Sequence, residues 1–324
     1  MSDVTFEKID NQILNAKLSS DYYLEYYKKD FKDYSFAINH DNELIGYCIC
    51  YQIERKLCIP FEGVKLNFIS DIWKTIHKLQ NKIQAHLDAI ATQNGCSEVI
   101  VMDALDQSKL TDLGQGLLNA NYNSRLVFEM TVGLKDFNEE VYYTKIRKSY
   151  KSLINWGRRS LEVTIIDRQN LSFERFIEFK KFHEKISGRQ TRSDESWNIQ
   201  YQMLEHGYGE LILADYEGVL VAGSLFIDQF ERTIYFTGVY ERELFDYGIS
   251  HYLLYHGICR SAARGNTSYF SLGCYETEIM DRKLYNIQFF KKGFAENLAP
   301  TILWRKVIGV ESDITIPELE QSNL

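Results

Sequence analysis

The stretch 281-DRKLYNIQFFKKGFAEN-297 decides how the rest of the chain is interpreted. Its large apolar residues recur three or four positions apart, which predicts one face of an amphipathic helix. These residues are Leu284, Ile287, Phe290 and Phe294. A glycine commonly follows the last turn of a helix, so we expect this one to end near Gly293, with its apolar face toward the core.

Three lysines of this helix fall in different directions. On a helical wheel Lys291 lies inside the apolar arc, Lys292 points away from it, and Lys283 sits in the first turn, where geometry is loose. A lysine on the core side must extend its ammonium to solvent, pair with an acid, or face a cavity. The pattern alone leaves all three interpretations of Lys291 open.

The neighbours of the helix add a second observation. It follows a predicted strand at 269–273 and precedes another at 301–307. This order, together with the motif residues Ile287, Phe290, Lys291, Gly293 and Phe294, resembles the C-terminal end of the FemAB and BioF2-like transferases, which belong to the GNAT (GCN5-related N-acyltransferase) superfamily. Ala295 stands where that family has a further glycine. The resemblance implies that Phe290 and Lys291 line an acyl-transfer site, with Lys291 polarising the reacting carbonyl.

Composition limits the alternatives. The 324 residues suit two domains of ordinary size, and the formal net charge of -8 argues against a broad basic surface, so we expect no DNA partner. No apolar run approaches the roughly 20 residues of a membrane span, and the charged N-terminus lacks the apolar core of a signal peptide, which predicts a cytoplasmic protein. The six cysteines and seven histidines show no metal-ligand spacing, so we expect no metal.

The first half of the chain reads as an alternation of helices and strands. We expect a helical segment over 1–33, a hairpin over 34–52, a strand at 64–68, a helix at 72–93, a strand at 97–102, a helix at 110–119 and a strand at 125–132.

The second half repeats this order. We expect a strand at 161–167, helices at 172–186 and 195–205, strands at 211–218, 219–228 and 232–240, a helix at 248–264, a strand at 269–272, the helix described above, and the strand at 301–307.

The two halves match at a near-constant offset. Gly46 corresponds to Gly223, 177 residues later, and Gly95 to Gly265, 170 residues later. An internal repeat of this length predicts two homologous domains. The resemblance to FemAB-type proteins implies that both are GNAT-like, so the expected fold class is α/β (α+β), with tandem GNAT-like domains at 1–142 and 143–324. Each would be a mixed, mostly antiparallel sheet flanked by helices.

A basic segment joins the halves. Residues 144–159 predict one helix, and the resemblance places a similar basic helix at the start of the second half of FemAB-like proteins. Its cations, with one just beyond, are Lys145, Arg147, Lys148, Lys151, Arg158, Arg159 and Arg168. They could form a solvated helix face or attract the phosphates of a substrate, and Arg147 is the candidate substrate-binding residue.

A phosphate-binding loop would precede the helix at 248–264. The superfamily offers helix N-terminal amides to the pyrophosphate of its donor, and the corresponding place here holds Gly248, Ile249 and Ser250. Phe245 replaces the usual basic residue and Asp246 adds a negative charge. The first half has no such loop before its long helix, so the resemblance implies a degenerate copy that shapes the acceptor cleft.

Candidate catalytic residues lie at the end of the predicted strand 232–240. Glu241 could be the general base for an amine acceptor and Tyr240 a proton donor to the leaving group, while Tyr235 on the same strand is a candidate substrate-binding residue. Arg189 and Arg192, between two predicted helices, are candidate anion-binding residues because the guanidinium fork suits carboxylate or phosphate.

Three functions follow from these observations. The first is an N-acyltransferase that moves an acyl group from acyl-CoA or acyl-carrier protein to an amine of a sugar, amino acid or cell-envelope precursor. The second is a FemAB-type ligase that uses aminoacyl-tRNA and a peptidoglycan peptide; residues 172–208 are too short for the helical hairpin that such ligases often insert. The third is a non-catalytic GNAT-fold binding protein, which the phenylalanine at position 245 favours.

Overall fold

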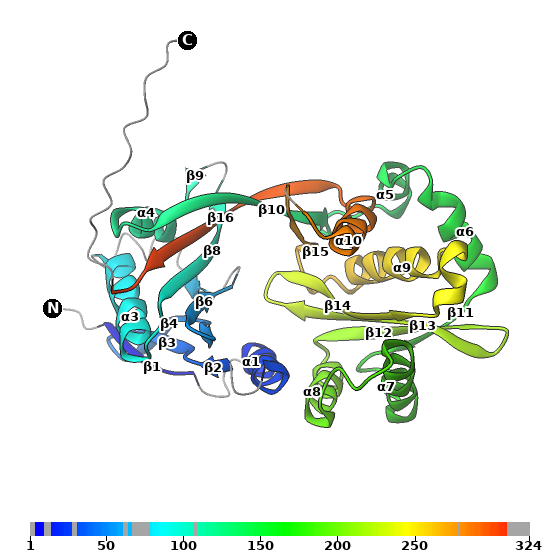
Figure 1. Cartoon of the computed structure of the whole chain (residues 1–324), viewed down its shortest axis with the longest axis horizontal. Coiled ribbons are helices and arrows are strands. Elements are labelled where there is room, and N and C mark those ends of the chain that lie inside the picture. The colour runs from blue at the N-terminus through cyan, green and yellow to red at the C-terminus, as the bar shows by residue number, and fades with distance from the viewer. Residues whose placement is uncertain are drawn as a thin grey trace, which may run out of the picture.

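Two long strands, β10 (Asn123–Gly133) and β16 (Asn297–Val307), run side by side across the molecule and join its two halves (Figure 1). The computed structural model describes residues 4–9, 14–27, 31–60, 64–66, 78–106, 109–277 and 279–309. Within these residues no helix is both long enough and apolar enough to cross a bilayer.

The large sheet continues from one half into the other. Its order is β11-β12-β13-β14-β15-β10-β16-β8-β6-β5-β2, with β9 (Lys109–Leu110) paired to β8. The strands of the second half are β11 (Glu162–Ile166), β12 (Gly209–Tyr216), β13 (Val219–Gln229), β14 (Arg232–Tyr240) and β15 (Tyr269–Tyr275). Those of the first half are β8 (Glu98–Asp106), β6 (Lys56–Ile59), β5 (Tyr51–Ile53) and β2 (Phe31–Asp33).

The pairing is mostly antiparallel, as expected. The parallel neighbours in the described sheets are β14 with β15 and β6 with β8. A smaller sheet in the first half has the order β1-β3-β4-β7, made of β1 (Val4–Lys8), β3 (Phe36–His40), β4 (Glu43–Cys48) and β7 (Val64–Leu66).

The two halves exchange their last strands. The first half runs through α3 (Leu79–Gln93), β8, α4 (Asp112–Asn119) and β10, and the second through α9 (Ile249–Arg264), β15, α10 (Arg282–Lys292) and β16. β10 lies next to β15 of the second half, whereas β16 lies between β10 and β8 of the first. The predicted tandem arrangement is confirmed, and the sheet does not stop at the proposed boundary at residue 142.

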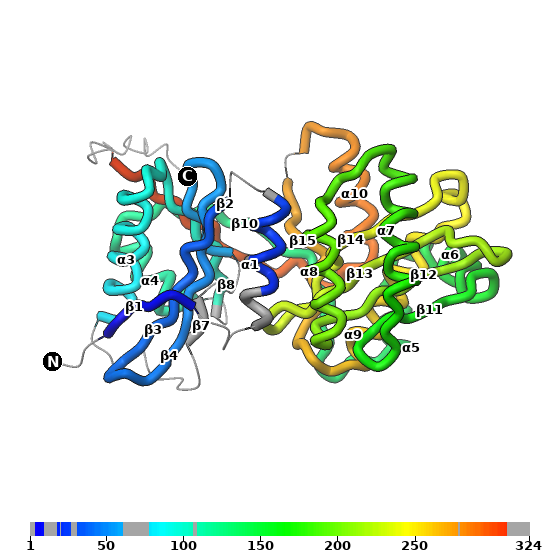
Figure 2. Tube along the Cα trace, turned by 90° about the horizontal axis from the view of Figure 1, so that it is seen from below, coloured from blue at the N-terminus to red at the C-terminus, as the bar shows by residue number. Residues whose placement is uncertain are grey.

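Helices cover both faces of the second-half sheet. β12 is buried on both sides, since Leu211 and Leu213 contact one core while Ile212 and Ala214 contact the other. The first core is covered by α7 (Phe173–Ser187) and α8 (Asp194–Glu205), the second by α6 (Tyr150–Ser160) and α9. α1 (Leu14–Tyr27) of the first half packs beside α8 (Figure 2).

Two predicted helices are corrected. The helix expected over 1–33 is wrong for Val4–Lys8, which forms β1 because its alternating apolar side chains pair with β3. The single helix expected at 144–159 is instead α5 (Glu139–Lys145) followed by α6. The chain breaks there because the backbone N–H of Arg147 donates to the carbonyl of Gly293, 3.0 Å away, rather than to its own helix.

Most other predicted elements are confirmed with small changes of length. The first hairpin turns at Asp41 and Asn42, both with positive φ, which is a tighter turn than expected. β16 begins at Asn297, four residues before the predicted strand at 301–307. The start of the helix expected at 72–93 and the end of the strand expected at 64–68 lie outside the described residues.

Candidate active site

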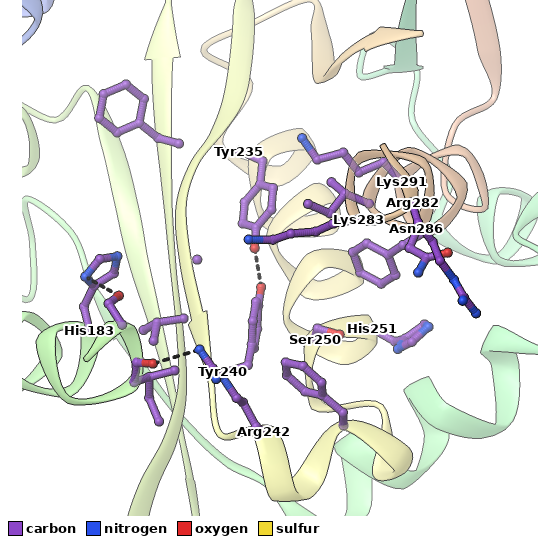
Figure 3. A pocket seen from close by; sticks show the side chains of 18 residues that line it. His183, Tyr235, Tyr240, Arg242, Ser250, His251, Arg282, Lys283, Asn286 and Lys291 are labelled. Atoms are coloured by element: carbon purple, nitrogen blue, oxygen red, sulfur yellow. Dashed lines mark hydrogen bonds between the residues drawn. The ribbon is translucent and has the colours of Figure 1, made fainter. Parts of the chain in front are cut away.

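A cavity of about 1210 Å³ opens where β14 and β15 separate. These strands pair only from Arg232–Tyr269 to Ile234–Ser271, so the rest of β14 runs free of β15. The space is closed by α10, by the start of α9 and by the 3-10 helix η3 (Arg242–Tyr247) (Figure 3). Its lining residues are His183, Ile186, Ser187, Tyr235, Phe236, Gly238, Val239, Tyr240, Arg242, Phe245, Ser250, His251, Arg282, Lys283, Asn286, Ile287, Phe290 and Lys291.

α10 covers the cavity rather than the core. It begins at Asp281, whose carboxylate accepts from the N–H of Leu284 at 2.8 Å, and Gly293 follows its last residue as expected. The expectation that its apolar face is buried is wrong, because Leu284 is 56% and Ile287 42% exposed. Of the four apolar residues only Phe294, just beyond the helix, is fully buried. The helix lies where β14 and β15 separate inside the sheet, so Ile287 and Phe290 of its apolar face line a cavity.

Lys291 extends from α10 into the cavity toward Tyr235 (Figure 3). Its ammonium lies 5.6 Å from the centre of the Tyr235 ring, and within the described residues no carboxylate forms an ion pair with it. Gly273, with φ of +93°, lies beside it, since a Cβ there would come within 3.7 Å of Nζ. Burial lowers the pKa of Lys291 below its usual value, while nearby Cys274 acts in the opposite direction.

Three hydroxyls form a chain next to this lysine. The Tyr240 hydroxyl lies 2.7 Å from Ser224 Oγ and 2.6 Å from the Tyr235 hydroxyl (Figure 3). Burial raises the pKa of both tyrosines, so both carry their protons at neutral pH. The tyrosines are five positions apart on one strand but share a face, because the pairing with β13 skips Phe236 and forms a bulge. Gly238 makes room for them, since a Cβ there would lie 1.8 Å from the Tyr235 hydroxyl.

The cavity is cationic although the chain is acidic. Arg242, Arg282, Lys283 and Lys291 line it, and none of its described lining residues is Asp or Glu. The whole chain has a formal net charge of -8, so this clustering is local. Such a cavity attracts anionic groups and disfavours a second positive charge inside it.

The start of α9 forms the floor of the cavity, and its three candidate residues point in different directions. Ser250 lines the cavity, Ile249 is fully buried in the core, and Gly248 lies against Leu153, where a Cβ would come within 2.5 Å. Gly248, with φ of +73°, ends η3 and precedes α9. Only Ser250 and the first backbone amides of α9 are thus placed to meet a ligand.

Two histidines that the sequence analysis missed also line the cavity. His251 packs edge-on against Tyr150 and Phe290, and burial lowers its pKa to about 4. Burial, with the guanidinium of Arg192 beside it, lowers the pKa of His183 to about 4 as well. Both are therefore neutral at pH 7. His251 directly follows Ser250 at the predicted helix start and could have been found there, whereas the sequence around His183 carries no such signal.

The other candidates lie outside the cavity lining. The Glu241 carboxylate accepts from the N–H of Arg242 and lies 4.0 Å from Lys185. Arg192 donates to Tyr22 of α1 and contacts His183, and Arg189 is exposed on the loop after α7. Arg147 lies on the far side of α10, with its guanidinium 3.8 Å from the centre of the Phe289 ring. Their predicted roles are not supported by these positions and stay predictions.

The sequence and the fold were compared with known protein families, curated proteins and solved structures. Residues 144–279 match the family model described as the acetyltransferase (GNAT) domain. No curated protein matches the sequence. Among solved structures, FemX aligns with a TM-score of 0.65 at 15% identity, covering 93% of this chain and 96% of its own.

Two further solved structures have the same fold. The structure of L-PGS from Bacillus licheniformis aligns with a TM-score of 0.59 at 11% identity, covering 95% of each chain. A tandem GNAT protein from the clavulanic acid biosynthesis pathway aligns with a TM-score of 0.52 at 6% identity, covering 95% of this chain and all of its own. At these identities the likeness concerns the fold, and it extends over both halves.

Proposed function

We propose that this chain, a FemAB-like member of the GNAT superfamily, transfers an acyl group from a thioester donor to an amine in the cavity beneath α10. The family and fold support acyl or aminoacyl transfer in general. The finer proposal is that the donor is acyl-CoA or acyl-carrier protein and that the acceptor is an amine of a sugar, amino acid or cell-envelope precursor. We place the reaction in the cytoplasm, where such donors are made.

The observation that carries the proposal is Lys291. In the transfer step the amine lone pair forms a bond to the thioester carbonyl carbon, and the carbonyl electrons move to oxygen. An ammonium in a partly dry cavity, without a carboxylate partner, is suited to stabilise that oxyanion. When the oxyanion collapses, the carbon–sulfur bond breaks and the thiolate leaves.

The hydroxyl chain provides a proton for the leaving group. If Ser224 donates to Tyr240 and Tyr240 to Tyr235, the Tyr235 hydroxyl proton is directed into the cavity. Tyr240, the sequence-based candidate, would then act through Tyr235. The departing thiolate takes this proton, and the acceptor amine loses its own proton to solvent or to the chain in return.

Deprotonation of the acceptor need not involve Glu241. Because four cations and no described carboxylate line the cavity, an ammonium that enters has its pKa lowered by like charge. The amine can therefore arrive neutral without a dedicated base. The same cations would also attract an anionic donor, whose phosphates would meet Arg242, Ser250 and the first amides of α9.

The aminoacyl-tRNA alternative is supported by one specific departure. Phe245 lines the cavity at the place where a CoA-binding loop would carry a basic residue, and Asp246 follows it. An apolar ring there suits the stacking of a terminal base better than a pyrophosphate. The chain would then be a FemAB-type peptide ligase. A non-catalytic binding protein is the third case, in which Lys291 would have no effect on turnover.

A thermal-shift panel separates these cases. Wild type and Lys291→Met are each mixed with acetyl-CoA, long-chain acyl-CoA, acyl-carrier protein or total tRNA, with Lys292→Met as the matched control. A donor well above its dissociation constant raises the melting temperature by mass action. A shift with a thioester, followed by N-acylated product in wild type and Lys292→Met but not Lys291→Met, is expected. A shift with tRNA alone supports the ligase, and no response to any donor contradicts both transfer functions.

A further inference from the structure

α10 and the residue before it expose large apolar side chains that do not line the cavity. Tyr285 is 53% exposed, Phe289 52% and Leu284 56%, and Met280 just before the helix is fully exposed. No residue of α10 is buried, and on this face the Arg147 guanidinium packs over the Phe289 ring. We propose that the outer face of α10, defined by these four residues, docks the protein onto an anionic bilayer surface. The inference does not depend on the transfer reaction.

Cations surround the outer face of α10. The Arg147 guanidinium lies 3.8 Å from the centre of the Phe289 ring, and Lys148 next to it is exposed. Lys292, the last residue of the helix, is exposed, and its ammonium donates to the Tyr275 hydroxyl at 3.2 Å. Alternation of exposed apolar and basic side chains is the pattern by which an interfacial helix enters the headgroup layer of an anionic membrane.

Two of the acids nearby have partners. The Asp281 carboxylate caps the N–H of Leu284, and Glu296 pairs with Lys145 at 2.7 Å. The backbone of Glu276 is held by the side chain of Gln288.

The first half of the duplicated fold provides an internal comparison. α4 occupies the place of α10 there, and it buries Leu113 and Leu117 against its own core. Its exposed apolar residue is Leu118, 52% exposed, and its sequence DLGQGLLN contains no cation. The shared fold therefore does not require an apolar and basic outer face on this helix, since α10 has one and α4 does not.

The chemistry of the face favours lipid over nucleic acid. Leu284 and Met280 are aliphatic and offer no ring for a base to stack on. One face of Phe289 is covered by Arg147, and its ring is already stacked with Tyr285 at a centroid distance of 6.3 Å. Acyl chains and headgroups accept aliphatic, aromatic and basic side chains together, because the interface offers both an apolar and an anionic layer.

Docking would set the orientation of the cavity. Lys283, Asn286, Phe290 and Lys291 line the cavity from one side of the same helix whose other side would contact the membrane. The cavity mouth would then lie about one helix diameter, roughly 10 Å, from the headgroups. A substrate anchored in the bilayer by a lipid tail could reach the cavity without leaving the membrane.

The test is vesicle flotation of the full chain. Vesicles of phosphatidylcholine alone and of phosphatidylcholine with phosphatidylglycerol are compared at low and high salt. We expect binding to the anionic vesicles that weakens with salt. Leu284→Gln with Tyr285→Gln should weaken it at least about tenfold, because each half-exposed side chain loses its insertion into the apolar layer. Lys148→Glu should weaken it about fivefold or more.

Controls separate this inference from the proposed function. Leu118→Gln removes an equally exposed leucine from α4 and should bind as wild type does. Lys291→Met should also bind vesicles normally, even if it is inactive. Circular dichroism verifies that each variant is folded. No binding to anionic vesicles overturns the proposal. It is also overturned if the Leu284 and Tyr285 variant instead loses binding to a single-stranded oligonucleotide, or loses a concentration-dependent dimer.

Discussion

The hydroxyl oxygens of Tyr235 and Tyr240 lie 2.6 Å apart, at the point where β14 leaves its parallel partner β15. The contact requires a bulge at Phe236 and the missing side chain of Gly238, since either a regular strand or an alanine would move the Tyr235 hydroxyl away. The strand is therefore shaped to bring two phenols together beside Lys291.

The first prediction follows from this pair. Tyr235→Phe and Tyr240→Phe should each lower kcat for acyl transfer by about tenfold or more, since a positioned proton donor contributes roughly 10² to 10⁴ in rate. The double variant should be little worse than either single one, because both interrupt the same chain of hydroxyls. Steady-state kinetics with the donor found by thermal shift measures this, and Tyr201→Phe, outside the cavity, is the control. Additive losses would contradict a shared chain.

The second prediction concerns Lys291. Lys291→Met should lower kcat by about 10²–10³, the usual effect of removing one oxyanion-stabilising donor. The same change should raise the free energy of unfolding by about 1 kcal/mol, because it removes a poorly solvated charge that has no ion-pair partner among the described residues. Denaturant unfolding and kinetics measure the two effects. Lys292→Met, on the other side of α10, should show neither. A destabilised Lys291→Met would indicate a structural role.

The third prediction concerns Gly238. Gly238→Ala should displace the Tyr235 ring and lower kcat as Tyr235→Phe does, with a loss of stability of about 2 kcal/mol. Gly133→Ala in β10 is the matched control, because its Cβ would meet only a flexible Glu296 oxygen at 3.9 Å. The pair is compared by thermal melting and by activity. Full activity of Gly238→Ala would show that the position of the Tyr235 hydroxyl does not matter.

The fourth prediction is a pH dependence in the first half. Burial raises the pKa of Asp103 on β8 from 3.8 to about 6, although Thr111 donates to its carboxylate at 2.5 Å. A raised carboxyl pKa means that this group stabilises the fold fully below pH 3.8 and that its contribution is lost as the pH rises through about 6. Asp103→Asn should therefore raise the free energy of unfolding by about 1 kcal/mol at pH 8, and the gain should shrink toward pH 4. Urea unfolding at the two pH values measures it, and a constant difference would refute this titration.

The fifth prediction uses the exchanged strands. A fragment of residues 1–142 lacks β16, which pairs with β8 from Glu98–Val307 to Ala104–Thr301. It should lack cooperative unfolding and aggregate through the exposed edge of β8. Mixing it with residues 143–324 during refolding should restore a folded complex. Circular dichroism and gel filtration report both results. A stable, cooperative 1–142 fragment would mean that the first half folds alone.

The sequence predicts more of the order of elements than of the site. Periodicity located α10 and put Lys291 on its apolar side, but it could not tell that this side meets a cavity, because that depends on where β14 and β15 separate. Tyr235 and Tyr240 are an odd number of positions apart, which in a regular strand puts them on opposite faces. Their contact depends on a β-bulge that no local sequence pattern predicts. The exchange of β10 and β16 depends on pairing over long sequence distances, which local patterns do not report.

That exchange also means that the sheet of the first half cannot be completed until the second half has been synthesised. β8 is complete when residue 106 has been made, but its neighbour in the sheet, β16, ends only at Val307. At about 5–20 residues per second, the ribosome needs on the order of tens of seconds to supply it. During that interval one edge of β8 has backbone N–H and C=O groups without hydrogen-bond partners. These groups can pair with strands of other nascent chains. Growth conditions that slow translation of the second half should therefore lower the soluble yield of the whole protein.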